Sequence, residues 1–252
     1  MQNKLRCLVL DIETAPMTVY VWQLKDQYVD LKQLKTDWYI IAWGAKWLGD
    51  PPSKVIYRSQ ENARKPEDDR TILKELWKLI NKADVVLTQN GAKFDMPKLN
   101  ARFILHGFKP TKPYKQCDVY KELRKVASFT SHSLEYVTHR VNKKYKKLTD
   151  RKFVGLALWT SCMNGVKAAW AEMRKYNIHD VLSLEEKYIN LRAWLPESAS
   201  TSYFVERPAT QCKVCGEKGH MIRRGVAVKN KFRYQRWQCQ TCGGWATGDR
   251  VK

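Results

Sequence analysis

The chain has 252 residues, which is enough for one main domain with a sizeable core and a smaller appended module. Its 46 Lys and Arg residues outnumber its 25 Asp and Glu residues and give a formal net charge of +21, which indicates a polyanionic partner. We expect nucleic acid rather than a membrane, because the basic residues do not gather beside an apolar anchor and no apolar run approaches the ~20 residues of a membrane-spanning helix.

The first half of the chain predicts five strands and two helices. Short apolar runs bounded by turn residues indicate strands, which we place at residues 5–14, 38–47, 54–58, 85–89 and 115–119. Apolar residues at helical spacing indicate helices at residues 69–83 and 95–105. Asp68 or Asp69 is available to cap the first of these helices.

The second half of the chain predicts further helices, followed by a linker and a small domain. Helical spacing recurs at residues 133–141 and 166–194. The order of elements predicts an α/β domain over residues 1–195, with a mixed five-stranded sheet flanked by helices. Residues 196–210 are rich in Pro, Ser, Ala and Thr, which predicts a linker to a small domain at residues 211–252.

Two acids end the first predicted strand. Asp11 and Glu13 are two positions apart, so their side chains project to the same face of a strand. Their mutual repulsion favours a bound cation, and hard carboxylate oxygens suit Mg²⁺ or Mn²⁺. The alternative is an exposed strand end with incidental acids.

Further acids follow on predicted helices. Asp95 begins a helix, where capping is the alternative explanation, and Tyr176 and Asp180 share one helix face at i and i+4. Acidic residues thus occur at three of the predicted strands and helices. This combination favours one shared metal site over a separate role for each acid. Asp118 is expected instead to cap a helix that starts near Val119.

Three segments, DIET, NGAKFD and YNIHD, resemble in this order the motifs of the DEDD superfamily of 3′→5′ exonucleases, which have a ribonuclease H-like fold. The resemblance covers residues 5–195. Tyr176, four residues before Asp180, resembles the tyrosine subclass. The histidine subclass has His five residues before that Asp, where this chain has Lys175.

The resemblance implies roles for the acids and the tyrosine. Two Mg²⁺ or Mn²⁺ ions about 4 Å apart would hold the scissile phosphate, one activating water and the other stabilising the leaving oxygen. Asp11 would contact both ions and Asp95 would act mainly through bound water. Glu13 and Asp180 would complete the first ion's ligands, and Tyr176 would orient the attacking water.

The resemblance also implies substrate contacts. Thr14 would face the terminal 3′-hydroxyl, and Asn90 and Phe94 would contact the terminal nucleotides. Core packing is the alternative for Phe94. Lys143 and Lys144 belong to a basic run that we expect to follow the phosphate backbone, with a solvated face as the alternative.

The C-terminal cysteines predict a structural zinc site. Two CxxC knuckles, each followed by Gly, offer four thiolates for one tetrahedral Zn²⁺: Cys212, Cys215, Cys239 and Cys242. A redox dithiol or disulfides are the alternative. The alternating residues between the knuckles predict a hairpin around Lys229 and Asn230, so the module resembles a zinc ribbon.

The zinc module is basic and carries aromatic residues. Arg233 and Trp237 are candidates for contacts to phosphates and bases. Docking to a polymerase or another replication or repair protein is the alternative use of the module.

These patterns predict a two-metal-ion 3′→5′ exonuclease acting on single-stranded or frayed ends, with DNA slightly preferred over RNA. The alternatives are a structure-specific endonuclease on the same fold and a non-catalytic nucleic-acid-binding zinc protein. The N-terminal apolar run turns acidic too early for a secretory signal, so we expect a cytoplasmic protein, or one in the host cytoplasm if it is viral.

Overall fold

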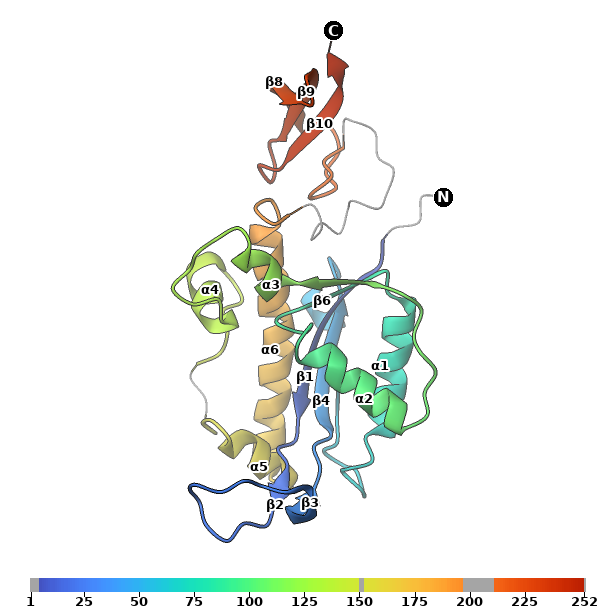
Figure 1. The fold of residues 1–252 in the computed structure, drawn as a ribbon, viewed down its shortest axis with the longest axis vertical. Helices are drawn as coiled ribbons and strands as arrows, with labels where there is room; N and C mark the ends of the chain where they lie inside the picture. The colour runs from blue at the N-terminus through green and yellow to red at the C-terminus, as the bar shows by residue number, and fades with distance from the viewer. Residues whose placement is uncertain (1–4, 150–151, 197–210, 252) are drawn as a thin grey trace.

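The computed structural model describes residues 5–149, 152–196 and 211–251. The predicted linker at 196–210 lies, apart from its first residue, outside this range. Two bodies are seen in Figure 1: an α/β domain and a small C-terminal β-domain. In the part of the chain that is described, no helix combines the length and apolar character needed to span a bilayer.

A mixed five-stranded sheet forms the centre of the first domain, as predicted. Its strands are β1 (Cys7–Thr14), β4 (Ile40–Trp47), β5 (Ile56–Ser59), β6 (Val85–Thr88) and β7 (Lys115–Asp118). The order is β5-β4-β1-β6-β7. The pairs β5–β4 and β4–β1 are antiparallel, whereas β1–β6 and β6–β7 are parallel. β1 is therefore the central strand and has a partner on each side.

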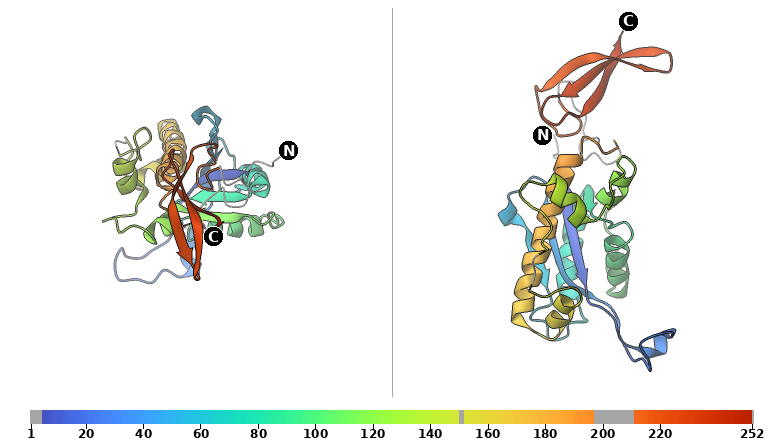
Figure 2. Two further views of the ribbon diagram at one scale, coloured as in Figure 1. Left: turned by 90° about the horizontal axis from the view of Figure 1, so that it is seen from above. Right: turned by 90° about the vertical axis from the view of Figure 1, so that its left-hand side faces the viewer.

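Helices cover both faces of this sheet (Figures 1 and 2). They are α1 (Arg70–Lys82), α2 (Asp95–Leu105), α3 (Val119–Arg124), α4 (Leu134–Val141), α5 (Ala157–Met163) and α6 (Lys167–Leu191). The sequence did not predict α5, nor the short hairpin of β2 (Thr18–Val19) and β3 (Leu34–Thr36). Both lie near the end of β1 that carries the acids (Figure 1).

The alternation of side chains along β1 decides which helix meets the acids. Leu8 and Leu10 pack with residues of α1 and α2, whereas Cys7 and Val9 pack on the opposite face with residues of α6. Asp11 and Glu13 continue the second series, because side chains two apart share a face. Both carboxylates thus project on the side that α6 covers.

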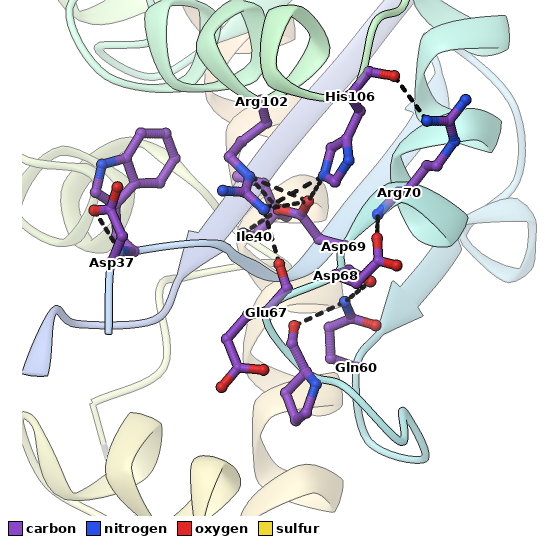
Figure 3. Close-up of polar contacts among 11 residues, drawn as sticks. Asp37, Ile40, Gln60, Glu67, Asp68, Asp69, Arg70, Arg102 and His106 are labelled. Carbon is purple, nitrogen blue, oxygen red and sulfur yellow. Dashed lines mark hydrogen bonds and ion pairs between the residues drawn. The ribbon is translucent and has the colours of Figure 1, made fainter. Parts of the chain in front are cut away.

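A buried ion pair fixes α2 near the edge of β4 (Figure 3). Asp69, whose side chain is fully buried, binds the Arg102 guanidinium at 2.8 Å and accepts a hydrogen bond from the Ile40 backbone N–H at 2.7 Å. Of the two predicted caps, Asp69 occupies the N-cap position of α1, but its side chain makes no capping bond there. Asp68 instead accepts a bond from the first backbone N–H of that helix. Asp69 serves tertiary packing, and a carboxylate so deeply buried requires such a partner.

The C-terminal domain is a three-stranded antiparallel sheet in the order β10-β9-β8. Its strands are β8 (Met221–Lys229), β9 (Phe232–Cys239) and β10 (Trp245–Val251). Asn230 and Lys231 form the β8–β9 turn with φ of 47° and 67°, as a two-residue hairpin turn requires. The predicted hairpin is confirmed with its turn one residue later, and β10 was not predicted.

Candidate metal centre and nucleic-acid groove

Three carboxylates from β1 and α6 meet in one small cluster. Asp11, Glu13 and Asp180 each place a carboxylate oxygen within 4.8 Å of the others. Tyr176 lies one turn before Asp180 on the same helix and is buried. The structure thus brings together four of the five predicted catalytic residues.

The fifth residue, Asp95, lies beside this cluster rather than in it. It is the first residue of α2, and its Oδ1 accepts a hydrogen bond at 3.2 Å from the backbone N–H of Ile12, between Asp11 and Glu13 in β1. The N-terminus of α2 has no side-chain cap bond from its N-cap residue, Phe94. Asp95 is the acidic residue of the first helical turn, as the alternative explanation has it, and it also makes a buried contact to the central strand.

The cluster concentrates negative charge in a buried place. Burial, followed by the neighbouring carboxylates, holds the pKa of Asp11 well above its usual value and raises the pKa of Glu13 to about 8. Burial is also the largest cause for Asp95, whose pKa rises to about 7, and it raises the pKa of Asp180. Each of these carboxyls is thus harder to ionise than a free carboxyl, and added positive charge would favour its ionised form.

The donor set fits a hard divalent cation. All three clustered groups offer carboxylate oxygens, the ligands that Mg²⁺ and Mn²⁺ prefer over softer donors. Oδ1 of Asp180 is buried and has no hydrogen-bond partner among the described residues. A buried carboxylate oxygen without a donor is able to bind a cation.

Lys147 supplies a positive charge to the cluster from the protein itself. Its Nζ lies 2.6 Å from Asp180 Oδ2 and donates to the Tyr176 hydroxyl at 2.8 Å. The carboxylate of Asp180 and the phenol of Tyr176 raise the Lys147 pKa above its usual value. Sequence analysis did not single out this lysine, because nothing local distinguishes it from the exposed lysines of the same basic run.

Two further side chains hold the acids of β1 in place. Trp159 of α5 donates its indole N–H to Glu13 at 3.0 Å, and its ring meets that of Tyr176 edge to face. Asn177 of α6 donates to Asp11 Oδ2 at 2.7 Å. The sequence offered one usable signal: Asn177 is a polar residue three positions before Asp180 and therefore on the same helix face.

An open groove of about 380 Å³ adjoins the acids. Its lining residues come from the end of β1, the start of α2 and the region of α5: Glu13, Thr14, Pro16, Phe94, Leu156 and Trp159. The predicted substrate residues Thr14 and Phe94 thus lie in one groove with a clustered carboxylate. Phe94 is 40% exposed, so core packing does not describe its position.

The other predicted contacts of the α/β domain lie elsewhere. Asn90 is a turn residue with φ of 63°, and its backbone N–H donates to Asp118 at 2.9 Å. Asp118 also caps α3, as predicted. Lys143 and Lys144 have exposed side chains, and their backbone N–H groups donate to Glu186 of α6. Neither lysine touches the acid cluster in the described contacts.

The four cysteines of the C-terminal domain also converge. Their sulfurs lie within 4.8 Å of one another, with Cys212 Sγ 3.7 Å from Cys242 Sγ and Cys215 Sγ 3.7 Å from Cys239 Sγ. A tetrahedral site with metal–sulfur bonds of about 2.3 Å requires sulfurs about 3.8 Å apart. The spacing matches a four-thiolate metal site and is consistent with a zinc ribbon.

A family model connects the α/β domain to known proteins. The RNase_H_2 model of the RNase_H superfamily matches residues 40–192, which is more than half of the chain. The chain belongs to the RNase_H superfamily. The match includes Asp95, Tyr176 and Asp180, whereas Asp11 and Glu13 precede it on β1. No curated protein matches the chain.

Solved structures agree with this fold, and 120 chains match. One is the family B DNA polymerase of the hyperthermophilic archaeon Pyrobaculum calidifontis, with a TM-score of 0.50 and 14% sequence identity. The alignment covers 79% of this chain and 27% of the polymerase chain, so this RNase_H superfamily member spans about a quarter of the polymerase's length. The likeness is one of fold.

Proposed function

We propose that the protein is a divalent-metal-dependent 3′→5′ exonuclease that hydrolyses single-stranded or frayed ends. The observation that carries the proposal is the meeting of Asp11, Glu13 and Asp180 within 4.8 Å, beside the groove that contains Thr14 and Phe94. The direction of hydrolysis rests on the resemblance of the three motifs to the tyrosine subclass of DEDD exonucleases. We favour DNA slightly over RNA.

Asp11, Glu13 and Asp180 would hold Mg²⁺ or Mn²⁺, and Asp95 would support the site from beside the cluster. Bound there, the ions would lower the pKa of a water and neutralise charge on the phosphate. Trp159 and Asn177 fix Glu13 and Asp11 through their hydrogen bonds. This restricts the carboxylates before substrate arrives, which reduces the reorganisation needed for the reaction.

Tyr176 is suited to orienting water rather than to removing a proton. Burial and the nearby Asp180 raise the Tyr176 pKa above its usual value of about 10, so the residue remains a neutral phenol at pH 7. Lys147 donates to its oxygen at 2.8 Å, and the hydroxyl also hydrogen-bonds with the Asp180 side chain. A neutral phenol held in this way can accept a hydrogen bond from a water beside Asp180.

The C-terminal domain would hold one structural Zn²⁺ through Cys212, Cys215, Cys239 and Cys242. We propose that it also binds nucleic acid. Arg233 is exposed on β9, and the guanidinium of Arg223 lies 5.4 Å from the Trp237 ring. Such mixtures of cations and rings suit phosphates and bases.

A single assay tests the enzymatic proposal. Linear 5′-labelled and circular single-stranded DNA, and the matching linear RNA, would be incubated with Mg²⁺ or Mn²⁺. We expect a ladder that shortens from the 3′ end, with circles intact, and at least a hundredfold loss of rate in Glu13→Gln, since one clustered ligand is lost. Glu135→Gln, which removes an exposed acid on α4, should leave the rate unchanged.

Two other outcomes of this assay would contradict the exonuclease proposal. Cleavage of circles would establish an endonuclease on the same site. Binding with no metal-dependent hydrolysis of any substrate would overturn both nuclease functions and leave a nucleic-acid-binding protein.

A further inference from the structure

The segment between β1 and β4 forms an arm that leaves the sheet at the acidic end of β1. Residues 16–37 make up this arm, and its base is closed by a hydrogen bond from Ala15 N–H to the Tyr39 carbonyl at 2.9 Å. It projects away from the body of the α/β domain (Figure 2, right). It contains the β2–β3 hairpin and a 3₁₀ turn, Leu31–Gln33, whose N-cap Asp30 makes a reciprocal capping box.

The arm exposes far more apolar surface than an ordinary loop. Trp22 is 98% exposed, Tyr28 89% and Tyr20 64%. Leu24 and Leu31 are 94% and 86% exposed. A cluster of large apolar side chains held away from the core is typical of a binding surface.

Internal hydrogen bonds give the arm a defined shape. Tyr20 N–H donates to the Gln33 carbonyl at 2.8 Å, and the Gln33 side chain returns a bond to the Tyr20 carbonyl at 2.9 Å. These bonds tie the two sides of the arm together. Tyr20 is therefore held by these bonds, and Trp22 and Tyr28 lie in the loop that the tied segments enclose.

We propose that this arm binds the unpaired bases of the nucleic acid whose end occupies the groove, a proposal that rests on the proposed function. The arm begins where the groove ends: Thr14 and Pro16 line the groove, and the chain runs from Pro16 directly into the arm. A strand that leaves the groove on this side meets Tyr20, Trp22 and Tyr28. Aromatic rings stack on any base, which suits a substrate bound without regard to sequence.

Charge favours this partner over a second copy of the chain. The arm carries three lysines and only three acids, so it adds no net repulsion toward phosphates. The protein as a whole has a net charge of +21, which attracts a polyanion and opposes close approach of another copy. Lys35 lies with its Nζ 5.6 Å from the Tyr20 ring, so a cation accompanies one of the stacking surfaces.

The test measures binding without hydrolysis. The full-length Trp22→Ala/Tyr28→Ala variant would be titrated, without added Mg²⁺ or Mn²⁺, with fluorescent single-stranded oligonucleotides of about 4 and about 20 nucleotides, and with a 20-mer of abasic sites. We expect the variant to bind the normal 20-mer roughly 10- to 100-fold more weakly than the wild type. The 4-mer and the abasic 20-mer should bind both proteins equally.

Trp194→Ala is the matched control, because this residue is 75% exposed near the end of α6 and outside the arm. It should bind every oligonucleotide as the wild type does. Equal affinity of the arm variant and the wild type for the normal 20-mer would overturn the proposal. So would a wild-type dimer that the arm substitutions convert to a monomer in analytical ultracentrifugation, since a second copy would then occupy the rings.

This test is independent of catalysis. Hydrolysis from the 3′ end with unchanged binding by the arm variant would reject the arm and retain the exonuclease. Ring-dependent binding by a protein that hydrolyses nothing would retain the arm and reject the exonuclease.

Discussion

Lys147 offsets part of the negative charge of the acid cluster. The cluster's three carboxylates, with Asp95 beside them, face this one ammonium, which contacts Asp180 at 2.6 Å. One positive charge does not balance four acids, and the raised pKa values of the acids follow from that deficit and from burial. A divalent cation would remove the deficit, so metal binding and proton release are coupled at this site.

This coupling predicts a pH-dependent stability. The pKa of Glu13 is raised to about 8 and that of Asp95 to about 7, whereas both are near 4 in an unfolded chain. Protonation of these two carboxyls therefore stabilises the folded protein. This contribution to the free energy of unfolding is complete below about pH 4 and is lost as the pH rises through 7 to 8. We expect the metal-free protein to lose unfolding free energy between about pH 5 and pH 8, and Mg²⁺ to restore it mainly at pH 8.

Urea denaturation without added divalent metal and in Mg²⁺ at each pH measures this effect. Glu13→Gln, which removes one titrating carboxyl, should flatten the profile. A profile that is the same with and without Mg²⁺ would contradict the coupling.

Lys147 itself gives a second prediction. Without added Mg²⁺ at pH 8, Lys147→Met should lower the free energy of unfolding by about 1–3 kcal/mol, because Asp180 loses its cationic partner in a largely buried position. Mg²⁺ should then raise the melting temperature of the variant more than that of the wild type. Lys144→Met, which removes an exposed lysine of the same segment, is the control for thermal unfolding and should behave as the wild type. Equal stabilisation of Lys147→Met and wild type by Mg²⁺ would argue against this role.

At the level of elements, the contact of α6 with β4 sets the position of the acids. A Cβ at Gly44 would lie 2.4 Å from Asn177 Oδ1 and 3.0 Å from Val181 Cγ2. Only glycine therefore permits this approach of helix and strand. The same Asn177 holds Asp11, so the packing distance and the geometry of the acids depend on each other.

Substitution at Gly44 tests this dependence. Gly44→Ala should destabilise the protein by about 1–3 kcal/mol, because the added methyl overpacks the interface. It should also reduce nuclease activity. The double variant Gly44→Ala/Asn177→Ala removes the clash. Its loss of unfolding free energy should therefore be smaller than the sum of the losses in the two single variants. Its activity should stay low. Strictly additive unfolding free energies would show that the two side chains do not compete for the same space.

The sequence predicted the elements that rest on local periodicity. Alternation along β1 placed Asp11 and Glu13 on one face, and the i, i+4 spacing placed Tyr176 with Asp180. The hydrogen bonds of Trp159 and Lys147 into the site depend on loops and a short helix whose paths no local pattern encodes. The same reason applies to the arm and to β10, whose short or irregular segments lack a clear period.

On the scale of the whole molecule, the two domains have different sources of stability. The α/β domain has three apolar clusters of its own. The C-terminal domain has one small cluster, in which the buried residues are Cys212, Met221 and Cys239. Two of these three are proposed zinc ligands, so metal binding supplies much of the folding free energy of this domain.

Removal of the metal should therefore unfold one domain alone. In a Cys212→Ser/Cys242→Ser variant, or after strong chelation, we expect the amides of β8–β10 to lose protection from hydrogen exchange. Amides of β1 and β4 should remain protected. Retained protection in β8–β10 would show that this domain folds without its metal.

The hydrogen bond from Asn177 to Asp11 joins residues 166 positions apart, and Asp180 lies still later in the chain. During synthesis from the N-terminus, the first two ligands appear at once, yet the last arrives only after most of the α/β domain has been made. A nascent chain thus carries no complete set of ligands. On the proposed function, the order of residues along the chain would delay nuclease activity until α6 has packed against the first strand.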